Sequence, residues 1–582
     1  MRRTANMKAK ASTAKPWLKF YTEEALNAKL PKETLYEHVL KNNEYHRGNV
    51  AINYFGNKIS YGEFLDTADV CAASFAELGI KTGDMVACCS ATIPELAFAL
   101  YGLNKLGAAM VALDPRRSLS EIKQFIVNSG ANVLLLIDLA YEHLADMLDE
   151  LSPEKVIIIS ADNYMSPVVR MLKQIKMPAP AVPIGGRTIS WKEFLKLGKG
   201  KSVEAVGYGE FELAAVTLTG GTTGMPKGVM LSNDGFNAVA INFRYCGVTY
   251  TRNQRFLDII PAFSSYGIVA SLHMPLSLGL EIVMIPKFDS DKVGQLVKKY
   301  KPSHTLLVPA HYEKLMNSKE MKNGFDLSFF RTAGSGGDTM NAGLESKLNG
   351  FLRERGCKYP LSQGYGMSEV SSAASCCCNG NFKSLSVGYP LLTTNVAIFK
   401  PGTTEELDYG EEGEICISGP SVMLGYLNNP EETEKVMVTH PDGTVWVHSG
   451  DLGCMDEDGF IFIKGRIKRM ITCFDGHKIF PVQIESVIGM VNDVQSCAVV
   501  GVADTEHAQG MHALAVVKLR QGADETAVRE ELKEKMEAEL EYRGRPKFLH
   551  FVEEMPLAGM GKIDYNKLAA DFNAFKNANI AV

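Results

Sequence analysis

The chain has 582 residues, of which 46% are hydrophobic and 22% charged, and its formal net charge is −6. This length exceeds what a single hydrophobic core serves, so we expect two or more domains. The acidic balance argues against a nucleic-acid-binding protein, and the sequence has no run of about 18 apolar residues that would predict a membrane-spanning helix.

Strand and helix patterns alternate over the first 160 residues, after an aromatic-rich segment at 16–21 that is expected to dock onto the body. Four short apolar runs predict strands that are buried on both faces. They span residues 85–89, 109–113, 133–137 and 156–159. A capping box of Ser118 and Glu121 begins one helix, and Gly130 ends it. The repeated strand–helix–strand order predicts an α/β fold with layered sheets.

Residues 163–202 concentrate positive charge in a chain that is acidic overall. The segment contains a single acid, Glu193, and eight basic residues. These are Arg170, Lys173, Lys176, Arg187, Lys192, Lys196, Lys199 and Lys201. Two interpretations stay open. The segment is either a solvated insertion or a surface that makes weak peripheral contact with an anionic membrane.

Residues 217–228 form a loop of four glycines, four threonines and one lysine, which predicts a polyphosphate-binding site. Glycines let consecutive N–H groups turn toward an anion, and Lys227 adds a positive charge. The loop is not a Walker A motif, because Met225 and Pro226 separate Gly224 from the lysine. The candidate phosphate-binding residues are Thr219, Gly220, Gly221, Thr222, Thr223, Gly224 and Lys227.

Three consecutive cysteines, Cys376, Cys377 and Cys378, lie farther along among twelve in all. Adjacent cysteines do not form ordinary disulfides, and no C-x-x-C pair supports a metal cluster. We therefore expect reduced thiols and a cytoplasmic protein, which does not exclude a peripheral position at the membrane.

The loop at 217–228 resembles the phosphate-binding signature of the adenylate-forming superfamily, which includes acyl-CoA synthetases, peptide-synthetase adenylation domains and beetle luciferases. Companion motifs follow in the family's order, and the resemblance covers residues 16–575. The segment 365–369 is similar to Y-G-x-T-E, with Ser368 in place of threonine. Segments 449–451, 465–469 and 556–564 resemble the ribose anchor, the hinge and the terminal lysine motif.

The resemblance implies an ATP-binding site with Mg²⁺. Tyr365 would stack on adenine, the Ser368 hydroxyl would meet the α-phosphate, and Glu369 would be the Mg²⁺ ligand. Asp451 would bind the ribose, and Arg466 the ribose or a phosphate. Besides the loop, the implied nucleotide-binding residues are Gly336, Gly337, Asp338, Gln363, Gly364, Tyr365, Gly366, Met367, Ser368, Asp451 and Arg466.

The resemblance also implies an acyl pocket and a path for the thiol. The pocket residues would be Phe263, Ser264, Tyr266, Gly267, Pro309 and Gly334, and the thiol tunnel would contain Gly476, His477 and Lys478. Many members have a histidine at the position of Ser264, which leaves the gating of the pocket open. The hairpin that carries His477 is one residue longer than the family's.

The implied activity is ATP-dependent conversion of a carboxylic acid to acyl-AMP, followed by thioester formation with coenzyme A. The catalytic residues would be Lys562, Thr222 and Glu369, with Lys468 as the hinge. A large N-terminal domain (1–466) would precede a small mobile α+β domain (467–582). The entry segment 16–21 favours a medium- or long-chain fatty acid.

Two alternatives stay open. One is a free-standing adenylation enzyme that loads a carrier protein, and the other is a nucleotide-binding sensor without catalysis. The sequence is compatible with a homodimer and does not specify one.

Overall fold

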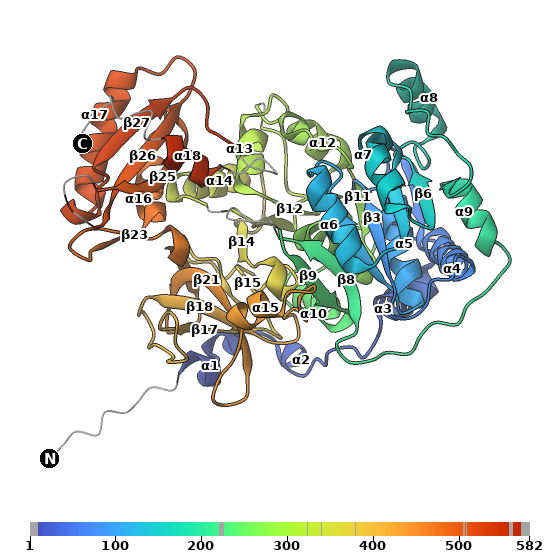
Figure 1. The fold of residues 1–582 in the computed structure, drawn as a ribbon. Helices are drawn as coiled ribbons and strands as arrows, with labels where there is room; N and C mark the ends of the chain where they lie inside the picture. The colour runs from blue at the N-terminus through green and yellow to red at the C-terminus, as the bar shows by residue number, and fades with distance from the viewer. Residues whose placement is uncertain are drawn as a thin grey trace.

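Two large sheets form most of the protein in the computed structural model (Figure 1). The structure describes residues 10–219, 226–322, 324–338, 340–378, 380–504, 507, 509–557 and 563–571. One sheet has eight strands in the order β19-β9-β8-β4-β3-β5-β6-β7, and the other has nine in the order β16-β15-β14-β13-β12-β10-β11-β1-β2. Both sheets are parallel at the centre; the nine-stranded sheet ends in antiparallel pairs on both sides, and the eight-stranded sheet only on the side of β8, β9 and β19. The predicted α/β class is confirmed.

The eight-stranded sheet contains the apolar runs that predict buried strands. Its members are β3 (Met85–Cys89), β4 (Ala109–Leu113), β5 (Val133–Ile137), β6 (Lys155–Ile159), β7 (Thr188–Ser190), β8 (Leu213–Leu218), β9 (Gly228–Ser232) and β19 (Gly425–Tyr426). The four predicted runs are confirmed as β3 to β6, the last one beginning a residue earlier. Helices on both faces supply the second apolar surface that such strands require.

These helices are α4 (Tyr61–Glu77), α5 (Pro94–Lys105), α6 (Leu119–Ser129), α7 (Asp138–Leu151) and α9 (Trp191–Gly198). Helix α8 (Pro167–Lys176) follows β6 and buries none of its residues. The capping box predicted from the sequence begins α6: the Ser118 hydroxyl accepts from the Glu121 N–H, and the Glu121 side chain accepts from the Ser118 N–H. Gly130 follows the helix with a φ of 65°.

The nine-stranded sheet lies beside the first and carries most of the predicted nucleotide and acyl residues. Its strands are β1 (Val50–Tyr54), β2 (Asn57–Ser60), β10 (Arg255–Asp258), β11 (Glu281–Met284), β12 (His304–Leu307), β13 (Thr332–Ser335), β14 (Ser362–Tyr365), β15 (Ser375–Cys376) and β16 (Tyr389–Pro390). The associated helices are α3 (Leu35–Asn43), α10 (Asn233–Arg244), α11 (Met274–Ser277), α12 (Val293–Tyr300), α13 (Pro309–Asn317) and α14 (Ala342–Glu354). A π-helix spans Tyr266–His273.

A five-stranded sheet of β17 (Asn395–Phe399), β18 (Gly413–Ser418), β20 (Met437–Thr439), β21 (Val445–Met455) and β22 (Ile461–Arg466) follows, with α15 (Pro430–Val436). The N-terminal segment contains α1 (Ala11–Ala14), a 3₁₀ turn at Pro16–Phe20 and α2 (Glu23–Leu26), and α1 packs against β17. Trp17 is fully buried, and the Tyr21 hydroxyl donates to the Pro390 carbonyl at 3.0 Å. The expected docking of this aromatic segment is therefore confirmed.

The C-terminal region is a small α+β unit at the left of Figure 1. It contains β23 (Ile471–Thr472), β24 (Lys478–Ile479), α16 (Pro481–Ile488), β25 (Val494–Ala503), β26 (Met511–Leu519), α17 (Glu525–Glu539), β27 (Phe548–Val552) and α18 (Tyr565–Asp571). Its two hydrophobic clusters draw only on residues from Ile471 onward. Helix α17 buries an apolar stripe of Val528, Leu532 and Met536.

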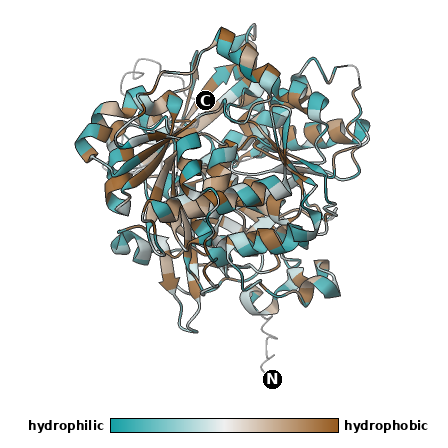
Figure 2. Ribbon diagram, turned by 90° about the vertical axis from the view of Figure 1, so that its right-hand side faces the viewer, coloured by the Kyte–Doolittle hydropathy of each residue, from teal (hydrophilic) through white to brown (hydrophobic). Residues whose placement is uncertain are grey.

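Figure 2 shows the hydropathy of each residue: the strands inside the sheets are mainly hydrophobic, and the surrounding helices carry both hydrophobic and hydrophilic residues in alternation. This alternation is typical of helices that bury one face. Among the described residues, none of the helices combines the length and the apolar character that crossing a bilayer requires.

Candidate active site

The predicted phosphate loop connects the antiparallel strands β8 and β9 as a hairpin. Its two ends are tied together, because the Thr219 N–H donates to the Lys227 carbonyl at 2.9 Å and the Lys227 N–H donates to the Thr219 hydroxyl at 3.0 Å. Arg117 also donates to the Thr219 carbonyl, at 3.3 Å. Gly220, Gly221, Thr222, Thr223 and Gly224 lie outside the described residues, so their predicted contacts stay predictions.

Lys227 is held at the mouth of this hairpin by two groups from the segment 425–436. Its Nζ atom forms an ion pair with Glu432 of α15 and lies 4.7 Å from the centre of the Tyr426 ring. The hydrogen bond from Lys227 lowers the pKa of Glu432 to about 2. A cation over an aromatic face keeps its charge while one side is shielded from water.

Tyr426 connects this lysine to the predicted magnesium ligand. Its hydroxyl donates to Oε1 of Glu369 at 2.7 Å, and both side chains are nearly buried. Burial, followed by the nearby Glu369 charge, raises the pKa of Tyr426, so the hydroxyl stays a donor. Neither Tyr426 nor Arg117 is predicted as a site residue from the sequence. A tyrosine two residues before the Asn428–Asn429 turn carries no local signal for that role.

Glu369 suits a hard divalent cation. Glu369 lies in a 3₁₀ turn, Ser368–Val370, which begins shortly after β14 ends at Tyr365. One carboxylate oxygen is anchored by Tyr426, and the other has no hydrogen-bond partner in the part of the chain that the structure describes. Carboxylate oxygens are the ligands that Mg²⁺ prefers. The neighbouring Ser368 hydroxyl accepts from the Ser265 hydroxyl at 3.1 Å.

Tyr365, Asp451 and Arg466 form the predicted adenine and ribose end of the site. The Tyr365 hydroxyl donates to Oδ2 of Asp451 at 2.7 Å, and Nε of Arg466 lies 2.9 Å from Oδ1. Asp451 and Arg466 face each other on the antiparallel strands β21 and β22. Burial raises the pKa of Asp451. Since a carboxylate offers about four lone-pair sites, both oxygens keep capacity for ribose hydroxyls.

Glycines allow the strands around this end to approach closely. An ideal Cβ on Gly366 would lie 1.9 Å from the Ser372 carbonyl oxygen, so no side chain fits there. At Gly337 the φ is +78°, and an ideal Cβ on Gly336 would lie 3.4 Å from the Gly364 carbonyl oxygen and 3.6 Å from the Tyr266 hydroxyl, so the ends of β13 and β14 lie close together beside Tyr266. Asp338 is exposed at the end of this loop.

The side-chain amide of Gln363 donates to Glu345 of α14, and the predicted contact of Gln363 with the nucleotide stays a prediction. Gln363 and Glu345 are both buried, and Glu345 also accepts from the Leu385 N–H at 3.1 Å. This contact ties α14 to β14 and supports the loop that carries Tyr365.

The predicted acyl wall begins at the π-helix. Phe263 is buried under the guanidinium of Arg116, at 5.4 Å from the ring centre. The Ser264 hydroxyl donates to the Pro261 carbonyl at 2.8 Å and accepts from the Gly267 N–H at 3.1 Å. Both hydrogen bonds of this hydroxyl are therefore made with the backbone. Gly267 has no room for a side chain, since an ideal Cβ would lie 2.0 Å from the Pro261 oxygen.

Two further predicted wall residues have structural roles. Gly334 lies on β13, where an ideal Cβ would lie 2.5 Å from Leu306, and its carbonyl accepts from the Tyr312 hydroxyl at 2.9 Å. Pro309 is the first residue of α13. A π-helix inside a helical segment frequently marks a functional site, which supports the position of the predicted wall.

The hinge and the hairpin lie on the C-terminal side. Lys468 is exposed in a 3₁₀ turn, Ile467–Arg469, and the next residue, Arg469, pairs with Glu485 and lies 3.7 Å from the Tyr565 ring centre. Gly476 (φ +81°), His477 and Lys478 belong to the hairpin β23–β24, whose polar contacts stay within the C-terminal region of the described chain. Lys562 lies outside the described residues.

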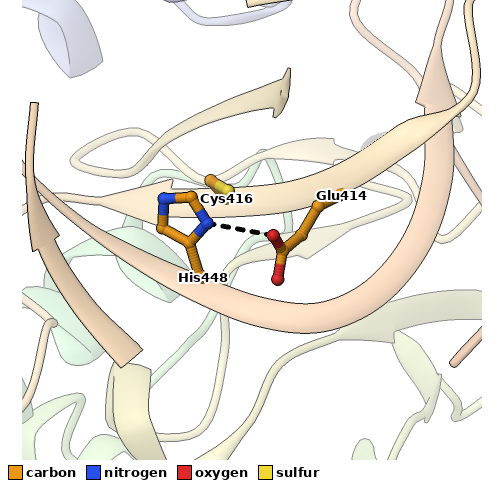
Figure 3. A group of neighbouring side chains, drawn as sticks. All are labelled: Glu414, Cys416 and His448. Atoms are coloured by element: carbon orange, nitrogen blue, oxygen red, sulfur yellow. Dashed lines mark hydrogen bonds and ion pairs between the residues drawn. The ribbon is translucent and has the colours of Figure 1, made fainter. Parts of the chain in front are cut away.

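A histidine and carboxylate group, with Glu414 and Cys416 on β18 and His448 on the neighbouring β21, is shown in Figure 3. Nδ1 of His448 is 2.9 Å from one oxygen of Glu414, whose other oxygen accepts from the Gly450 N–H at 2.9 Å. Nε2 of His448 lies 3.0 Å from Nε2 of His440. Glu414, Cys416 and His448 have ligand atoms within 4.8 Å of one another.

This group fits a hydrogen-bonded support better than a metal centre. Burial raises the pKa of the Cys416 thiol, and a protonated thiol is a poor metal ligand. The carboxylate of Glu414 instead joins β18 to the backbone of Gly450, the residue before Asp451. Sequence reasoning did not single out this support, because Glu414 and His448 lie 34 residues apart in the chain.

Comparisons with known proteins agree with this geometry. A family model for AMP-binding enzymes matches residues 39–427, and one for the AMP-binding enzyme C-terminal domain matches residues 483–562. The chain is 29% identical to a long-chain-fatty-acid–CoA ligase of Bacillus subtilis, over 94% of this chain and 96% of that protein. It is 28% identical to a probable 4-coumarate–CoA ligase of Dictyostelium discoideum, over 87% and 89%. The ATP-bound MatB from Rhodopseudomonas palustris has the same fold, with a TM-score of 0.77 and 23% identity over 93% of this chain and 99% of that one.

Proposed function

Because the chain belongs to the AMP-binding enzyme family, we propose that it activates a carboxylic acid with ATP and transfers the acyl group to coenzyme A. In the first step a carboxylate oxygen bonds to the α-phosphorus, and the bond to the bridging oxygen breaks, so that pyrophosphate leaves with the electron pair. In the second step the coenzyme A sulfur bonds to the acyl carbon, and AMP leaves. The proton of the thiol goes to solvent or to a base.

The chain's own residues divide this work. Lys227 and the closed hairpin would hold the β- and γ-phosphates, and the Ser368 hydroxyl would meet the α-phosphate. Asp451, oriented by Tyr365 and Arg466, would accept from the ribose hydroxyls. Glu369 would hold Mg²⁺, which neutralises phosphate charge when it is bound.

One observation carries the proposal: a continuous set of contacts joins the phosphate hairpin to the predicted metal ligand. It runs from Lys227 through the Tyr426 ring to the Glu369 carboxylate. Tyr365, which lies four residues before Glu369 in the chain, extends this set of contacts, because its hydroxyl donates to Asp451. Such a set of contacts would offer positive charge, a carboxylate ligand and a ribose acceptor to one bound nucleotide, which supports the proposal.

For the acid we propose a medium- or long-chain fatty acid. The named Bacillus relative and the buried aromatic segment 16–21 support this choice. The Dictyostelium relative makes an aromatic acid such as 4-coumarate the main competitor. An enzyme for fatty acids distinguishes its substrates mainly through apolar contacts with the acyl chain. We therefore expect kcat/KM to rise by about tenfold or more for each added pair of methylenes, until the pocket is filled.

The test is an assay of the purified chain with ATP, Mg²⁺ and coenzyme A against octanoate, palmitate, 4-coumarate and anthranilate, with AMP, pyrophosphate and acyl-CoA measured separately. We expect all three products with palmitate or octanoate. A carrier protein bearing phosphopantetheine replaces coenzyme A in a parallel arm, and acylation only in that arm would overturn the acyl-CoA assignment. The variant Asp451→Ala should lose activity, and Asp442→Ala, at an exposed position of the same region, is the matched control.

A further inference from the structure

Helix α8 presents an apolar face to solvent. Its stripe consists of Val168, Met171, Leu172 and Ile175, which are 65%, 57%, 51% and 74% exposed, and none of the residues in the helix is buried. This i, i+3, i+4, i+7 spacing usually marks the side of a helix that packs against a core. In α8 the apolar side chains have this spacing, but they are exposed and do not pack against a core.

The exposed apolar side chains are concentrated in this one segment. Eighteen large hydrophobic side chains are exposed in the part of the chain that the structure describes, and six of them lie between residues 168 and 184. Single exposed hydrophobic residues need no explanation, whereas a cluster marks an interaction surface. Figure 1 shows α8 at the upper right, at the end of the molecule opposite the C-terminal elements α16 to α18.

Two contacts hold α8 so that its stripe faces outward. Val169 packs partly against the main core, and Nζ of Lys173 lies 2.7 Å from Oδ1 of the buried Asp162. At about 100° per residue, these two side chains lie roughly 130° around the helix axis from the centre of the stripe. The orientation is therefore set by the body of the protein and leaves the apolar face available.

The charges near α8 are positive. Of the eight basic residues in 163–202, three are paired with acids from outside the segment: Lys173 with Asp162, Arg187 with Asp149, and Lys201 with Glu77. The other five form no ion pair with the described residues; they are Arg170, Lys176, Lys192, Lys196 and Lys199. An amphipathic helix with basic flanks suits the interface of an anionic bilayer.

We propose that α8 binds in the plane of an anionic membrane, with its apolar stripe in the boundary between headgroups and acyl chains and its basic residues among the headgroups. A second copy of this chain would oppose the same positive charges, so charge complementarity favours the lipid. The proposal is independent of which acid the enzyme activates. It assigns the contact to a helix that inserts, whereas the sequence suggests only the positive charge of residues 163–202.

Vesicle co-sedimentation tests the insertion. Wild-type protein should bind vesicles of equal parts phosphatidylcholine and phosphatidylserine, and bind vesicles of phosphatidylcholine alone at least about tenfold less. The double variant Met171→Glu/Ile175→Glu should lose at least about tenfold in binding. Its matched control is Val127→Glu/Leu139→Glu, which places two carboxylates at similarly exposed apolar positions on α6 and α7 and should bind as wild type does.

The charge variant Arg170→Glu/Lys176→Glu separates insertion from simple attraction. Insertion predicts that both the stripe variant and the charge variant bind weakly. Loss in the charge variant with full binding by the stripe variant would overturn insertion, and so would an absence of wild-type binding at low ionic strength. Thermal unfolding and activity on a short, soluble acid verify that each variant is folded.

A tryptophan placed on the stripe reports its environment directly. The native tryptophans, Trp17, Trp191 and Trp446, are 0%, 4% and 2% exposed, so Ile175→Trp adds the one accessible indole among the described positions. Its emission should shift to shorter wavelength with anionic vesicles and be quenched by brominated lipid. Binding without either change overturns the proposal. A wild-type dimer in sedimentation velocity without vesicles, with a monomeric stripe variant, would assign the face to a second copy and also overturn it.

Discussion

At the scale of single residues, the hydroxyl of Tyr426 orders the carboxylate that is predicted to hold the metal. The same ring lies next to the Lys227 ammonium, so one side chain contacts both charges. Removing the hydroxyl leaves the ring contact and deletes the hydrogen bond. A variant without the hydroxyl therefore tests the contact with Glu369 separately from the contact with Lys227.

Tyr426→Phe should lower the rate of ATP–pyrophosphate exchange by about 10- to 100-fold, because a hydrogen bond to a charged group contributes about 1.5–3 kcal/mol. The loss should be smaller at high Mg²⁺ concentration if Glu369 is a metal ligand. Tyr36→Phe is the matched control, since it removes a tyrosine–carboxylate bond of the same length, 2.7 Å to Asp69, in another part of the protein. Equal effects of both variants would contradict the role of Tyr426.

Lys562 is the cation that the resemblance places between the carboxylate and the α-phosphate. We expect Lys562→Ala to reduce acyl-AMP formation by roughly 10²–10³-fold, which is the typical cost of one lost electrostatic contact in the transition state. Thioester formation from synthetic acyl-AMP should change far less. Lys567→Ala, at an exposed position of α18, is the control. An equal loss in both half-reactions of a folded variant would contradict the assignment.

Glu95 gives the N-terminal α/β layer a pH dependence. It is fully buried at the start of α5, and burial raises its pKa to about 8 from an ordinary value of 4.5. Its Oε1 atom accepts from the Asn163 amide at 2.9 Å. Between pH 4.5 and 8 the folded state therefore holds a proton that the unfolded state has released, so this group's contribution to stability is lost as the pH rises.

Glu95→Gln should remove that slope and raise the free energy of unfolding at pH 8 by a few kcal/mol, as an order of magnitude. Urea unfolding at a series of pH values measures it. Glu142→Gln on the exposed face of α7 should leave the slope unchanged. A Gln variant whose stability still falls across this pH window would show that another group titrates there.

At the scale of elements, α6 depends on its N-cap. The predicted capping box is present, and the helix also carries Gln124 and Phe125, which line a cavity of about 200 Å³ together with Lys227 and Asn429. The cap therefore belongs to a helix that lies beside the phosphate hairpin, because α6 and Lys227 line the same cavity. Arg117, just before the cap, contacts the hairpin directly.

Ser118→Ala should destabilise the protein by about 1 kcal/mol, because one N-terminal N–H loses its acceptor. Chemical denaturation gives the difference, and Ser120→Ala, two residues into the same helix, should change stability by at most a few tenths of that amount. A loss of the same size in both variants would mean that helix propensity, rather than the cap, governs this position.

At the scale of the whole molecule, we propose that residues 467–582 form a domain that rotates against residues 1–466. The described residues form exposed polar contacts across this boundary, such as Arg520 with Glu313 at 2.7 Å and Lys347 with Asn492 at 2.6 Å. Exposed pairs of this kind contribute about 0–1 kcal/mol each, so the contacts present here would not prevent rotation.

Lys468→Pro should restrict that rotation, since proline fixes φ near −65°. We expect one half-reaction to survive and the other to fail. Pyrophosphate release without coenzyme A measures the first, and conversion of synthetic acyl-AMP to the thioester measures the second. Lys468→Ala keeps the backbone free and should retain both. Wild-type rates in the proline variant would remove Lys468 from the hinge role.

Local features of the fold follow from the sequence wherever neighbouring residues decide the outcome. Strands β3 to β6 are continuous apolar runs, and α6 begins and ends at residues with the right side chains, so both were predicted closely. The family motifs are likewise short segments. Their order along the chain identified the family before any residue was placed in space.

Contacts between distant segments were decided by the tertiary structure alone. Tyr426 donates to Glu369, Arg466 faces Asp451 across a strand pair, and the Gln363 amide donates to Glu345. The apolar stripe of α8 could equally have faced a core, and the ion pair of Lys173 with Asp162 is what turns it outward. Sequence determines which side chains are available within a turn or a strand, whereas register and packing determine which distant partners they reach.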